Sequence, residues 1–372
     1  MLYNIQMKPI TIIGIGKLGL GFALILEKHY NVLGIDINQD YVNNLNNKTY
    51  TTNEPEYTEL LSKSTNFRAS TDLKEGLDHS DIIFIIVQTP NSGNDKFYDH
   101  SILSNLLVKI NSFQPKNKNI IIGCTIIPTY IDNIGKQLLN NCYNCDLSYN
   151  PEFVAQGDII NGFRNPDIIL IGSLKQELLD ILKDIYNNIC ISIPKYCFMK
   201  PLEAEIVKIS LNGYITTKIS FANMISDLCD NLNVDKDIVL NAIGSDSRIG
   251  TKYFKSGYSF GGPCFPRDTK ALKQITDKYG IESDLLQGTI NYNRFHYKYQ
   301  AEQLLKQNKD SYIFTNVCYK EDSKIPIIEE SAKLKIAEYL ANKNKKVIIK
   351  DIDDIIIEVK KEYGNLFSYE II

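Results

Sequence analysis

Cys264 lies in the stretch FGGPCFPRD, residues 260–268, where a thiol follows two glycines and a proline. A structural cysteine usually lies among aliphatic residues, whereas Gly261 and Gly262 leave this backbone open. Pro266 suits the first position of a helix, because that position needs no N–H donor. The pattern predicts that Cys264 lies just before a helix N-terminus, where the helix dipole favours the thiolate. Cys264 is therefore a candidate nucleophile.

Lys208 and Asn212 form a second polar group, within residues 201–231, a long stretch with helical periodicity. Residues four apart in a helix share one face, so these two side chains are expected to lie side by side. Two roles fit this spacing. The pair either belongs to a solvated face or donates hydrogen bonds to a developing oxyanion.

The first strands of the fold are predicted around a glycine turn in residues 10–36, where strand, turn, helix and strand follow one another. Gly14 makes the tight turn, Gly16 lets the backbone approach a pyrophosphate, and Gly19 lets helix and strand pack closely. The helix N-terminus supplies N–H groups for the phosphates. Asp36 ends the second strand, where a carboxylate binds ribose hydroxyls and repels a 2′-phosphate. The expected cofactor is NAD rather than NADP.

Further apolar runs at 81–90, 119–128 and 167–172 predict buried parallel strands of the same sheet. Ligands of such sheets bind at the carboxyl ends of the strands, where Thr89 and Thr125 lie. Strands around 311–320 and 346–352, with a helix from about residue 329, predict a second, smaller α/β unit. The chain is expected to end in a polar, irregular tail.

The composition is typical of a globular protein, with 44% hydrophobic and 23% charged residues. A chain of 372 residues is expected to form two or three domains. A net charge of −3 gives no reason to expect nucleic acid or a membrane surface as a partner. Eight irregularly spaced cysteines, no long apolar run and no secretory pattern at the start favour the cytoplasm. Cys142 and Cys145 form a lone CxxC without histidines at ligand spacing, so no metal is expected.

Five separated segments within residues 10–320 resemble the nucleotide-sugar 6-dehydrogenases, the UDP-glucose/GDP-mannose dehydrogenase family, and within it the UDP-glucose branch. These segments are GIGKLG with Asp36, VQTP, CTIIP, YNPEFVAQG followed by NPDIILIG, and EAEIVKISLN leading to RIGTKYFKSGYSFGGPCFPRD. The resemblance implies a Rossmann-type NAD-binding domain at 1–195, a central helical dimerisation and catalytic-cysteine region at 196–295, and a C-terminal nucleotide-sugar-binding α/β domain at 296–372.

The resemblance also implies a reaction, the NAD-dependent four-electron oxidation of the 6-hydroxymethyl group of UDP-glucose to UDP-glucuronate. Cys264 would form a thiohemiacetal with the intermediate aldehyde, which a second oxidation converts to a thioester. Lys208 and Asn212 correspond to the oxyanion-stabilising pair. Asp268 and Thr125 match residues that position water or a proton acceptor, and Glu152 matches an acid of the proton transfers and of thioester hydrolysis.

The remaining site residues follow from the same resemblance. The cofactor is expected at Gly14, Gly16, Lys17, Leu18, Gly19, Asp36, Thr89, Thr125, Gln156 and Arg267. The nucleotide sugar is expected at Glu152, Phe153, Lys208, Asn212, Arg248, Tyr253, Lys255, Gly261 and Lys320. Arg248 matches an arginine that reaches the neighbouring subunit's site, which implies a homodimer.

The chain departs from the family pattern at four places, including Gln156, which stands where a glutamate is usual, and Lys17-Leu18, which replace an aromatic residue and a valine. The others are Thr315-Asn316 and Glu329-Glu330-Ser331 in the C-terminal part. Three alternatives to UDP-glucose oxidation stay open, the first of them motivated by the altered C-terminal part. They are the same chemistry on a UDP-N-acetylhexosamine or GDP-mannose, a non-catalytic nucleotide-sugar-binding protein, and a β-hydroxyacid dehydrogenase that performs one oxidation and needs no Cys264.

Overall fold

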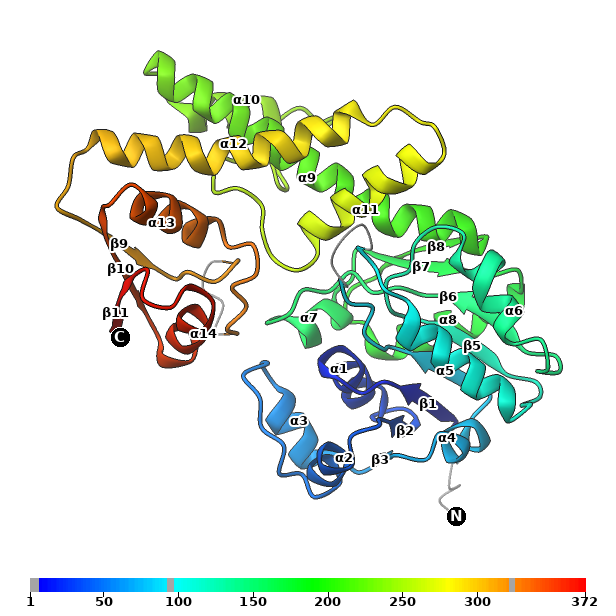
Figure 1. Ribbon diagram of the computed structural model, residues 1–372. Helices are drawn as coiled ribbons and strands as arrows, with labels where there is room; N and C mark the ends of the chain where they lie inside the picture. The colour runs from blue at the N-terminus through cyan, green and yellow to red at the C-terminus, as the bar shows by residue number, and fades with distance from the viewer. Residues whose placement is uncertain (1–6, 92–96, 321–324) are drawn as a thin grey trace. The chain divides into compact units, whose positions relative to one another are not determined.

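The structure, a computed structural model, describes residues 7–91, 97–320 and 325–372. It divides into two compact units, residues 1–208 and 209–372 (Figure 1). The first six residues, part of the segment expected to carry no secretory pattern, lie outside the described part. Among the residues that the structure describes, no helix is long and apolar enough to cross a membrane.

The first unit is built on an eight-stranded sheet in the order β3-β2-β1-β4-β5-β6-β7-β8. Neighbouring strands are parallel except β6 and β7, which pair antiparallel. The strands are β1 Pro9–Ile13, β2 Asn31–Ile35, β3 Phe67–Ser70, β4 Ile82–Ile85, β5 Asn119–Ile122, β6 Asp146–Tyr149, β7 Ile168–Gly172 and β8 Lys195–Met199. The predicted α/β fold with a parallel-dominated sheet is confirmed.

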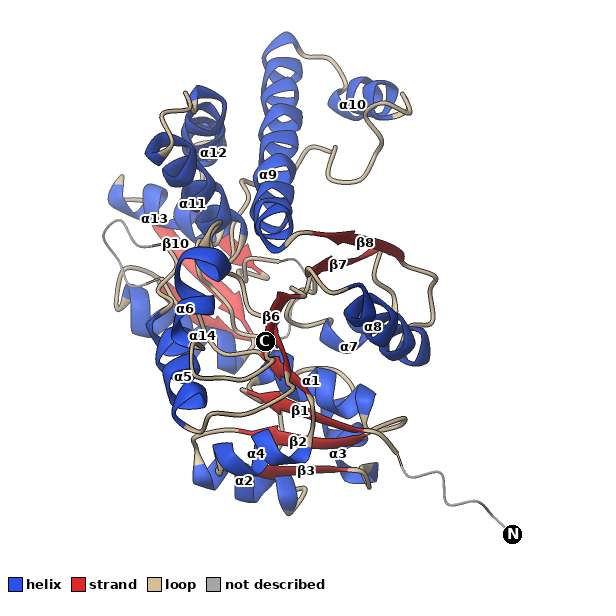
Figure 2. Cartoon of the chain, turned by 90° about the vertical axis from the view of Figure 1, so that its right-hand side faces the viewer, coloured by secondary structure: helices blue, strands red, loops and turns tan. Residues whose placement is uncertain are grey.

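Helices cover both faces of this sheet (Figure 2). Alternate residues of β1 explain why, since Ile12 belongs to the apolar cluster on one face and Ile13 to the cluster on the other. On the first face α1 and α8 pack, and α8 buries Leu178, Leu182 and Ile185 at helical spacing. On the second face α4 and α5 pack. The helices of this unit are α1 Lys17–Leu26, α2 Gln39–Asn46, α3 Tyr57–Lys63, α4 Leu73–His79, α5 Ser101–Ser112, η1 Ile131–Gly135, α6 Lys136–Leu138, α7 Ile159–Arg164 and α8 Gln176–Ile189.

The long helix α9 runs from Pro201 to Leu232, as its periodicity predicts, and most of it belongs to the second unit. The second unit also contains a three-stranded parallel sheet in the order β11-β10-β9. Its elements are α10 Lys236–Gly244, α11 Phe265–Lys278, α12 Asp284–Lys306, β9 Ser311–Thr315, α13 Ala332–Asn342, β10 Lys346–Asp351, α14 Asp353–Tyr363 and β11 Ser368–Ile371.

The end of the chain differs from the prediction of an irregular tail, because it forms α14 and β11. Ile355, Ile356 and Val359 are buried, and their spacing is that of one helix face. Acidic side chains at Asp353 and Asp354 support the helix start, and Lys360 and Lys361 support its end. The segment thus carries a short amphipathic pattern that its polar composition conceals.

Candidate active site

The glycine turn between β1 and α1 combines two crowded glycines with an open one. Gly14 has φ +90°, and a Cβ there would lie 2.5 Å from the Ile86 carbonyl oxygen. A Cβ on Gly19 would collide with the carbonyl oxygen of Gly14. A Cβ on Gly16, the N-cap of α1, would meet no atom within 4 Å. The turn therefore holds α1 close to the sheet and leaves the helix N-terminus accessible, which fits the pyrophosphate of NAD.

Asp36 follows β2 directly, and its carboxylate accepts a 3.1 Å hydrogen bond from the Asn38 backbone N–H. This bond holds the carboxylate at the carboxyl end of the strand, where a ribose binds in such folds. Of the two residues that depart from the family pattern inside the turn, Lys17 begins α1 and is exposed. Leu18 is half-buried against the apolar core, so a leucine in place of the usual valine affects the packing of that core.

Thr89, Thr125 and Glu152 follow the neighbouring strands β4, β5 and β6. Because these strands are parallel, the three residues come to the same edge of the sheet as the glycine turn. Thr89 is buried, Thr125 is half-buried, and Gln156 lies half-buried in the loop after Glu152. The sheet thus brings the cofactor residues predicted in the first unit to its carboxyl edge.

The loop after Thr125 is held by Glu205 of α9, a buried residue. Its carboxyl group accepts hydrogen bonds from the backbone N–H groups of Thr129, at 2.6 Å, and of Ile131, at 2.9 Å. Burial raises the pKa of Glu205 to about 7, against the effect of these two N–H donors. The sequence EAEIVK gave no direct indication of this contact, because its partners lie 74 and 76 residues earlier in the chain.

Glu152 and Lys208 come together in the first unit. The Lys208 Nζ donates a hydrogen bond to the Glu152 carbonyl oxygen and lies 4.3 Å from the centre of the Phe153 ring. Only 7% of Lys208 is exposed, which excludes a solvated face at this position. A buried ammonium is a cationic hydrogen-bond donor, the type of group that stabilises an anionic oxygen.

The Glu152 side chain lies against a buried tyrosine. The Tyr186 hydroxyl is 3.0 Å from Glu152 Oε1 and 2.7 Å from Asn150 Oδ1. Burial raises the pKa of Glu152 to about 7, although the Tyr186 hydroxyl and the charge of Lys208 both lower it. A carboxyl group with this pKa both gains and loses a proton near neutral pH, as a general acid or base does.

Cys264, Asp268 and Asn212 form a second group, in the unit of residues 209–372. Cys264 is the N-cap of α11 and is exposed, with Pro266 as the second helical residue rather than the first. Asp268, one turn further, is buried and accepts a 2.5 Å hydrogen bond from Asn212 Nδ2 of α9. The thiol therefore lies at the end of the helix that favours its ionised form.

Close packing between α9 and α11 positions this second group. Thr216 and Thr269 share a 2.8 Å hydrogen bond between their buried hydroxyls. At Gly213 a Cβ would lie 2.7 Å from a methyl group of Leu272. The glycine pair before Cys264 is also enclosed, because a Cβ on Gly261 would collide with the Glu330 carbonyl oxygen and one on Gly262 with the Tyr319 ring. The cysteine loop is thus anchored on both sides.

The other predicted substrate residues lie on exposed segments. Arg248 forms a two-point contact with Asp246, through Nε at 3.0 Å and Nη2 at 2.7 Å. Tyr253 and Lys255 are exposed in the same loop between α10 and α11. Lys320 is exposed and borders residues 321–324, which lie outside the described part, and Arg267 lies half-buried in the first turn of α11.

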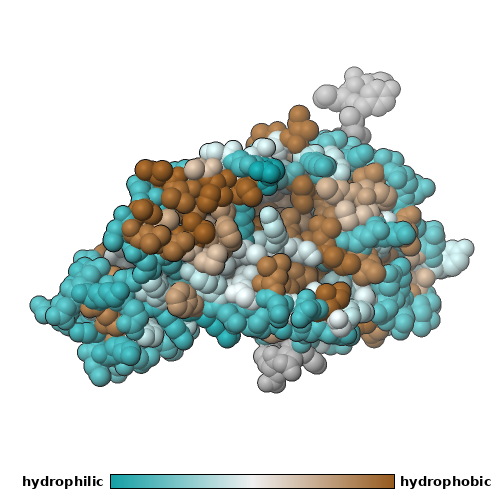
Figure 3. All heavy atoms as spheres, turned by 90° about the horizontal axis from the view of Figure 1, so that it is seen from above, coloured by the Kyte–Doolittle hydropathy of each residue, from teal (hydrophilic) through white to brown (hydrophobic). Residues whose placement is uncertain are grey.

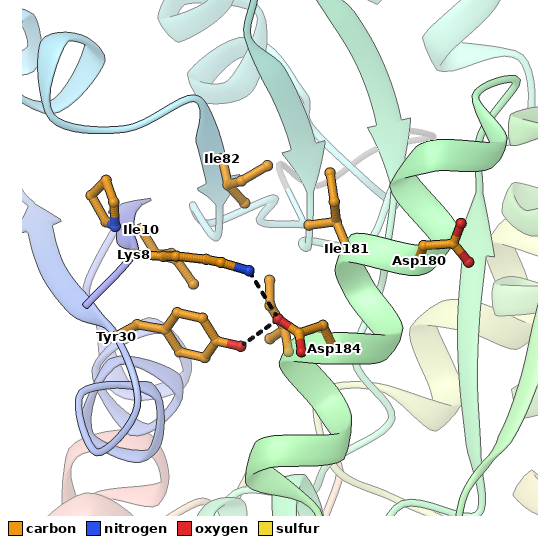
Figure 4. Close-up of a pocket in the computed structure, with 9 residues that line it drawn as sticks. Lys8, Ile10, Tyr30, Ile82, Asp180, Ile181 and Asp184 are labelled. Atoms are coloured by element: carbon orange, nitrogen blue, oxygen red, sulfur yellow. Dashed lines mark hydrogen bonds and ion pairs between the residues drawn. The ribbon is translucent and has the colours of Figure 1, made fainter. Parts of the chain in front are cut away.

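A cavity of about 360 Å³ in the first unit lies apart from these groups (Figure 4). Its lining includes Pro9 and Ile82, the first residues of β1 and β4, together with Tyr30 and Asp184. It therefore lies at the amino ends of these strands, the opposite edge from the glycine turn. Figure 4 shows Lys8 and Tyr30 directed at the Asp184 carboxylate, one of the polar groups that line the cavity.

Comparisons with known proteins match two parts of the chain to domains of one family. Residues 8–190 match the NAD-binding domain of the UDP-glucose/GDP-mannose dehydrogenase family, and residues 202–295 match its central domain. The chain is 30% identical to UDP-glucose 6-dehydrogenase of Rickettsia bellii over 77% of this chain and 66% of that protein. It is also 30% identical to UDP-glucose 6-dehydrogenase AglM of Haloferax volcanii, over 76% of this chain and 69% of that one.

The chain therefore spans about two thirds of the length of these relatives. A solved UDP-glucose dehydrogenase from Pyrobaculum islandicum has the same fold, with a TM-score of 0.88 over 99% of this chain and 87% of that chain, at 24% identity. The family predicted from the sequence motifs is confirmed, and so is NAD as the cofactor of its first domain. The chain belongs to the UDP-glucose/GDP-mannose dehydrogenase family, and its glycine turn and Cys264 lie in the two matched domains.

Proposed function

We propose that the protein oxidises the 6-hydroxymethyl group of UDP-glucose to a carboxylate in two NAD-dependent steps, with Cys264 as the covalent nucleophile. In this proposal residues 1–195 bind NAD, residues 196–295 carry the dimer contact and the nucleophile, and residues 296–372 bind the nucleotide. The observation that carries the proposal is the placement of Cys264 at the N-terminus of α11, one turn from the Asp268–Asn212 contact. A dehydrogenase that performs a single oxidation has no use for this thiol.

NAD, when bound, accepts the hydride in each oxidation. After the first oxidation the Cys264 thiolate adds to the aldehyde carbon, and the carbonyl oxygen gains negative charge. Lys208 and Asn212 stabilise this charge as donors, and the Asn212 amide has a second N–H because only one is used by Asp268. The second oxidation converts the thiohemiacetal into a thioester.

Hydrolysis of the thioester completes the proposed reaction. Glu152 takes a proton from the attacking water, the carbon–sulfur bond breaks, and the thiolate of Cys264 is restored. A pKa of about 7 suits this step, because the carboxylate is available as a base at neutral pH. Thr125 and Asp268 help to position the water in this proposal, and Phe153, Tyr253, Lys255, Gly261 and Lys320 contact the nucleotide sugar.

The substrate can be tested with a panel of nucleotide sugars. We expect kcat/KM for UDP-glucose to exceed that for UDP-N-acetylglucosamine, UDP-N-acetylmannosamine and GDP-mannose, with UDP-glucuronate as the product identified by mass spectrometry. A higher kcat/KM for one of the other three would keep the chemistry and change the substrate. Tight binding of UDP-glucose without any turnover would instead support a non-catalytic binding protein.

We also propose that the protein is a homodimer built on α9. Tyr214, Phe221 and Leu228 follow one another at intervals of seven residues and are 67%, 47% and 53% exposed. Figure 3 shows apolar side chains gathered in patches on one face of the molecule. A seven-residue apolar repeat on a long exposed helix suits packing against a second copy of that helix.

In such a dimer the exposed Arg248 would leave Asp246 and bind the nucleotide sugar of the partner, because a guanidinium binds phosphate oxygens at two points.

A complementation experiment tests the dimer and its shared site together. Cys264→Ser and Arg248→Ala chains are each expected to be inactive, whereas their mixture regains activity. One site of each heterodimer then combines an intact Cys264 with an intact Arg248. Native mass spectrometry of differently tagged chains verifies that the subunits exchange. Verified heterodimers that show no activity above the parents would contradict the shared site.

A further inference from the structure

The Tyr186 hydroxyl has two acceptors and one proton. Tyr186 is fully buried on α8, and its oxygen lies 2.7 Å from Asn150 Oδ1 and 3.0 Å from Glu152 Oε1. A phenol can donate only one hydrogen bond at a time and can accept another. All three groups are therefore satisfied together only when Glu152 is protonated and supplies a second proton.

Asn150 is held in place at one end of the hydrogen bonds that link Asn150, Tyr186 and Glu152. Its Nδ2 donates a 2.9 Å hydrogen bond to the Leu170 carbonyl oxygen, so that Oδ1 must face Tyr186. Its backbone N–H is bound to the Ile122 carbonyl oxygen at 2.9 Å, and the residue is 2% exposed. The amide therefore has little freedom to turn and presents a permanent acceptor to the tyrosine.

The hydrogen bonds that link Asn150, Tyr186 and Glu152 can adapt to both protonation states of Glu152. When Glu152 is protonated, its O–H donates to the Tyr186 oxygen and Tyr186 donates to Asn150, so every group is paired. When Glu152 is ionised, the Tyr186 proton turns to the carboxylate, and Asn150 Oδ1 loses its donor. We infer that Tyr186 and Asn150 are positioning residues for Glu152, which hold its carboxyl group in one place and set its proton affinity with opposite signs. This role rests on the proposed function only in assigning Glu152 to catalysis.

Other charged or titratable groups beside Glu152 do not change this arrangement. Lys208 from α9 supplies a positive charge that lowers the pKa of Glu152. Cys190, at the end of α8, has its pKa raised to about 11 by burial and by the charge of Glu152, so it stays neutral. Burial and Glu152 also raise the pKa of Tyr186, so its proton remains on the phenol. Of these groups, Glu152 is the one that titrates near neutral pH.

Tyr186 and Asn150 shift the pKa of Glu152 in opposite directions. Tyr186→Phe removes the donor to the carboxylate, and a hydrogen bond to a charged group is stronger than one between neutral groups. The pKa of Glu152 should then rise by about one pH unit. Asn150→Leu removes the competing acceptor. Tyr186 can then donate to the Glu152 carboxylate without leaving another buried acceptor unpaired, so the pKa of Glu152 should fall.

The experiment is a ¹³C NMR titration of protein labelled at the glutamate side-chain carboxyl carbons, with the Glu152 signal assigned from Glu152→Gln. Tyr30→Phe is the matched control, because Tyr30 is buried and its hydroxyl accepts a 2.9 Å hydrogen bond from Asn188, also on α8. We expect an upward shift in Tyr186→Phe, a downward shift in Asn150→Leu and none in the control. No shift in Tyr186→Phe, or a shift in the same direction in both variants, would overturn the inference.

The outcome is independent of the proposed reaction. If Asn150→Leu does not fold, the Tyr186→Phe titration alone decides. Where the enzyme turns over, the limb of the kcat profile that reports Glu152 should move with the NMR midpoint, with KM nearly unchanged. Opposite shifts in a protein that oxidises no nucleotide sugar would keep the inference and reject the function.

Discussion

Cys264→Ser is expected to reduce steady-state oxidation of UDP-glucose by about 10³-fold or more, the scale of losing a covalent nucleophile. The N-terminus of α11 favours a thiolate at residue 264, whereas a serine hydroxyl there stays protonated at neutral pH. An ester on serine is also hydrolysed much less readily than a thioester. The variant should therefore stop after partial oxidation.

Mass spectrometry of the quenched reaction measures this effect directly. We expect the variant to accumulate either a one-hydride product or a covalent sugar adduct on the peptide that contains residue 264. Cys145→Ser is the matched control, since Cys145 is half-buried and its thiol lies within hydrogen-bond distance of the Pro115 and Tyr143 carbonyl oxygens. Normal formation of the acid by Cys264→Ser would reject covalent catalysis.

Lys208→Met is expected to lower kcat by about 10²–10³-fold while KM changes little, the effect of removing an oxyanion donor. The methionine side chain keeps an apolar group of similar length beside the Phe153 ring and removes the ammonium, whose loss also raises the pKa of Glu152. A donor that acts on developing charge is lost mainly from the transition state, so the loss should appear in kcat.

Lys183→Met is the control for this substitution. Lys183 also places its ammonium over an aromatic ring, that of Tyr196 at 5.8 Å, but it lies on α8 and contributes nothing to the proposed chemistry. We expect kcat and KM of the control to match those of the wild type. Lys208→Met with an unchanged kcat and a raised KM would assign Lys208 to substrate binding instead.

The sequence predicted the parts of the fold that depend on local pattern. The order of β1, α1 and β2 followed from apolar runs around the glycine turn, and α9 followed from its periodicity. The chain end was predicted wrongly, because α14 shows only three buried apolar residues in a polar context. Strand β11 depends on pairing with β10, which composition does not reveal.

The candidate site was predictable where a motif concentrates chemistry in a few adjacent residues, as at Gly14 to Gly19 and at Cys264. Tyr186 and Asn150 were not predicted as parts of it. In the sequence Tyr186 occupies an ordinary core position of an amphipathic helix, and only the fold brings its hydroxyl to Glu152, 34 residues earlier. Polar contacts across long sequence separations carry no local pattern, so they are seen only in the structure.

The most direct test of the four-electron mechanism is the number of NADH molecules formed for each UDP-glucose consumed. Absorbance at 340 nm counts NADH, and chromatography of the same sample counts the nucleotide sugar and its product. We predict two NADH per sugar and no released aldehyde, because Cys264 holds the intermediate between the two oxidations. One NADH per sugar, or free aldehyde as the main product, would contradict the four-electron mechanism.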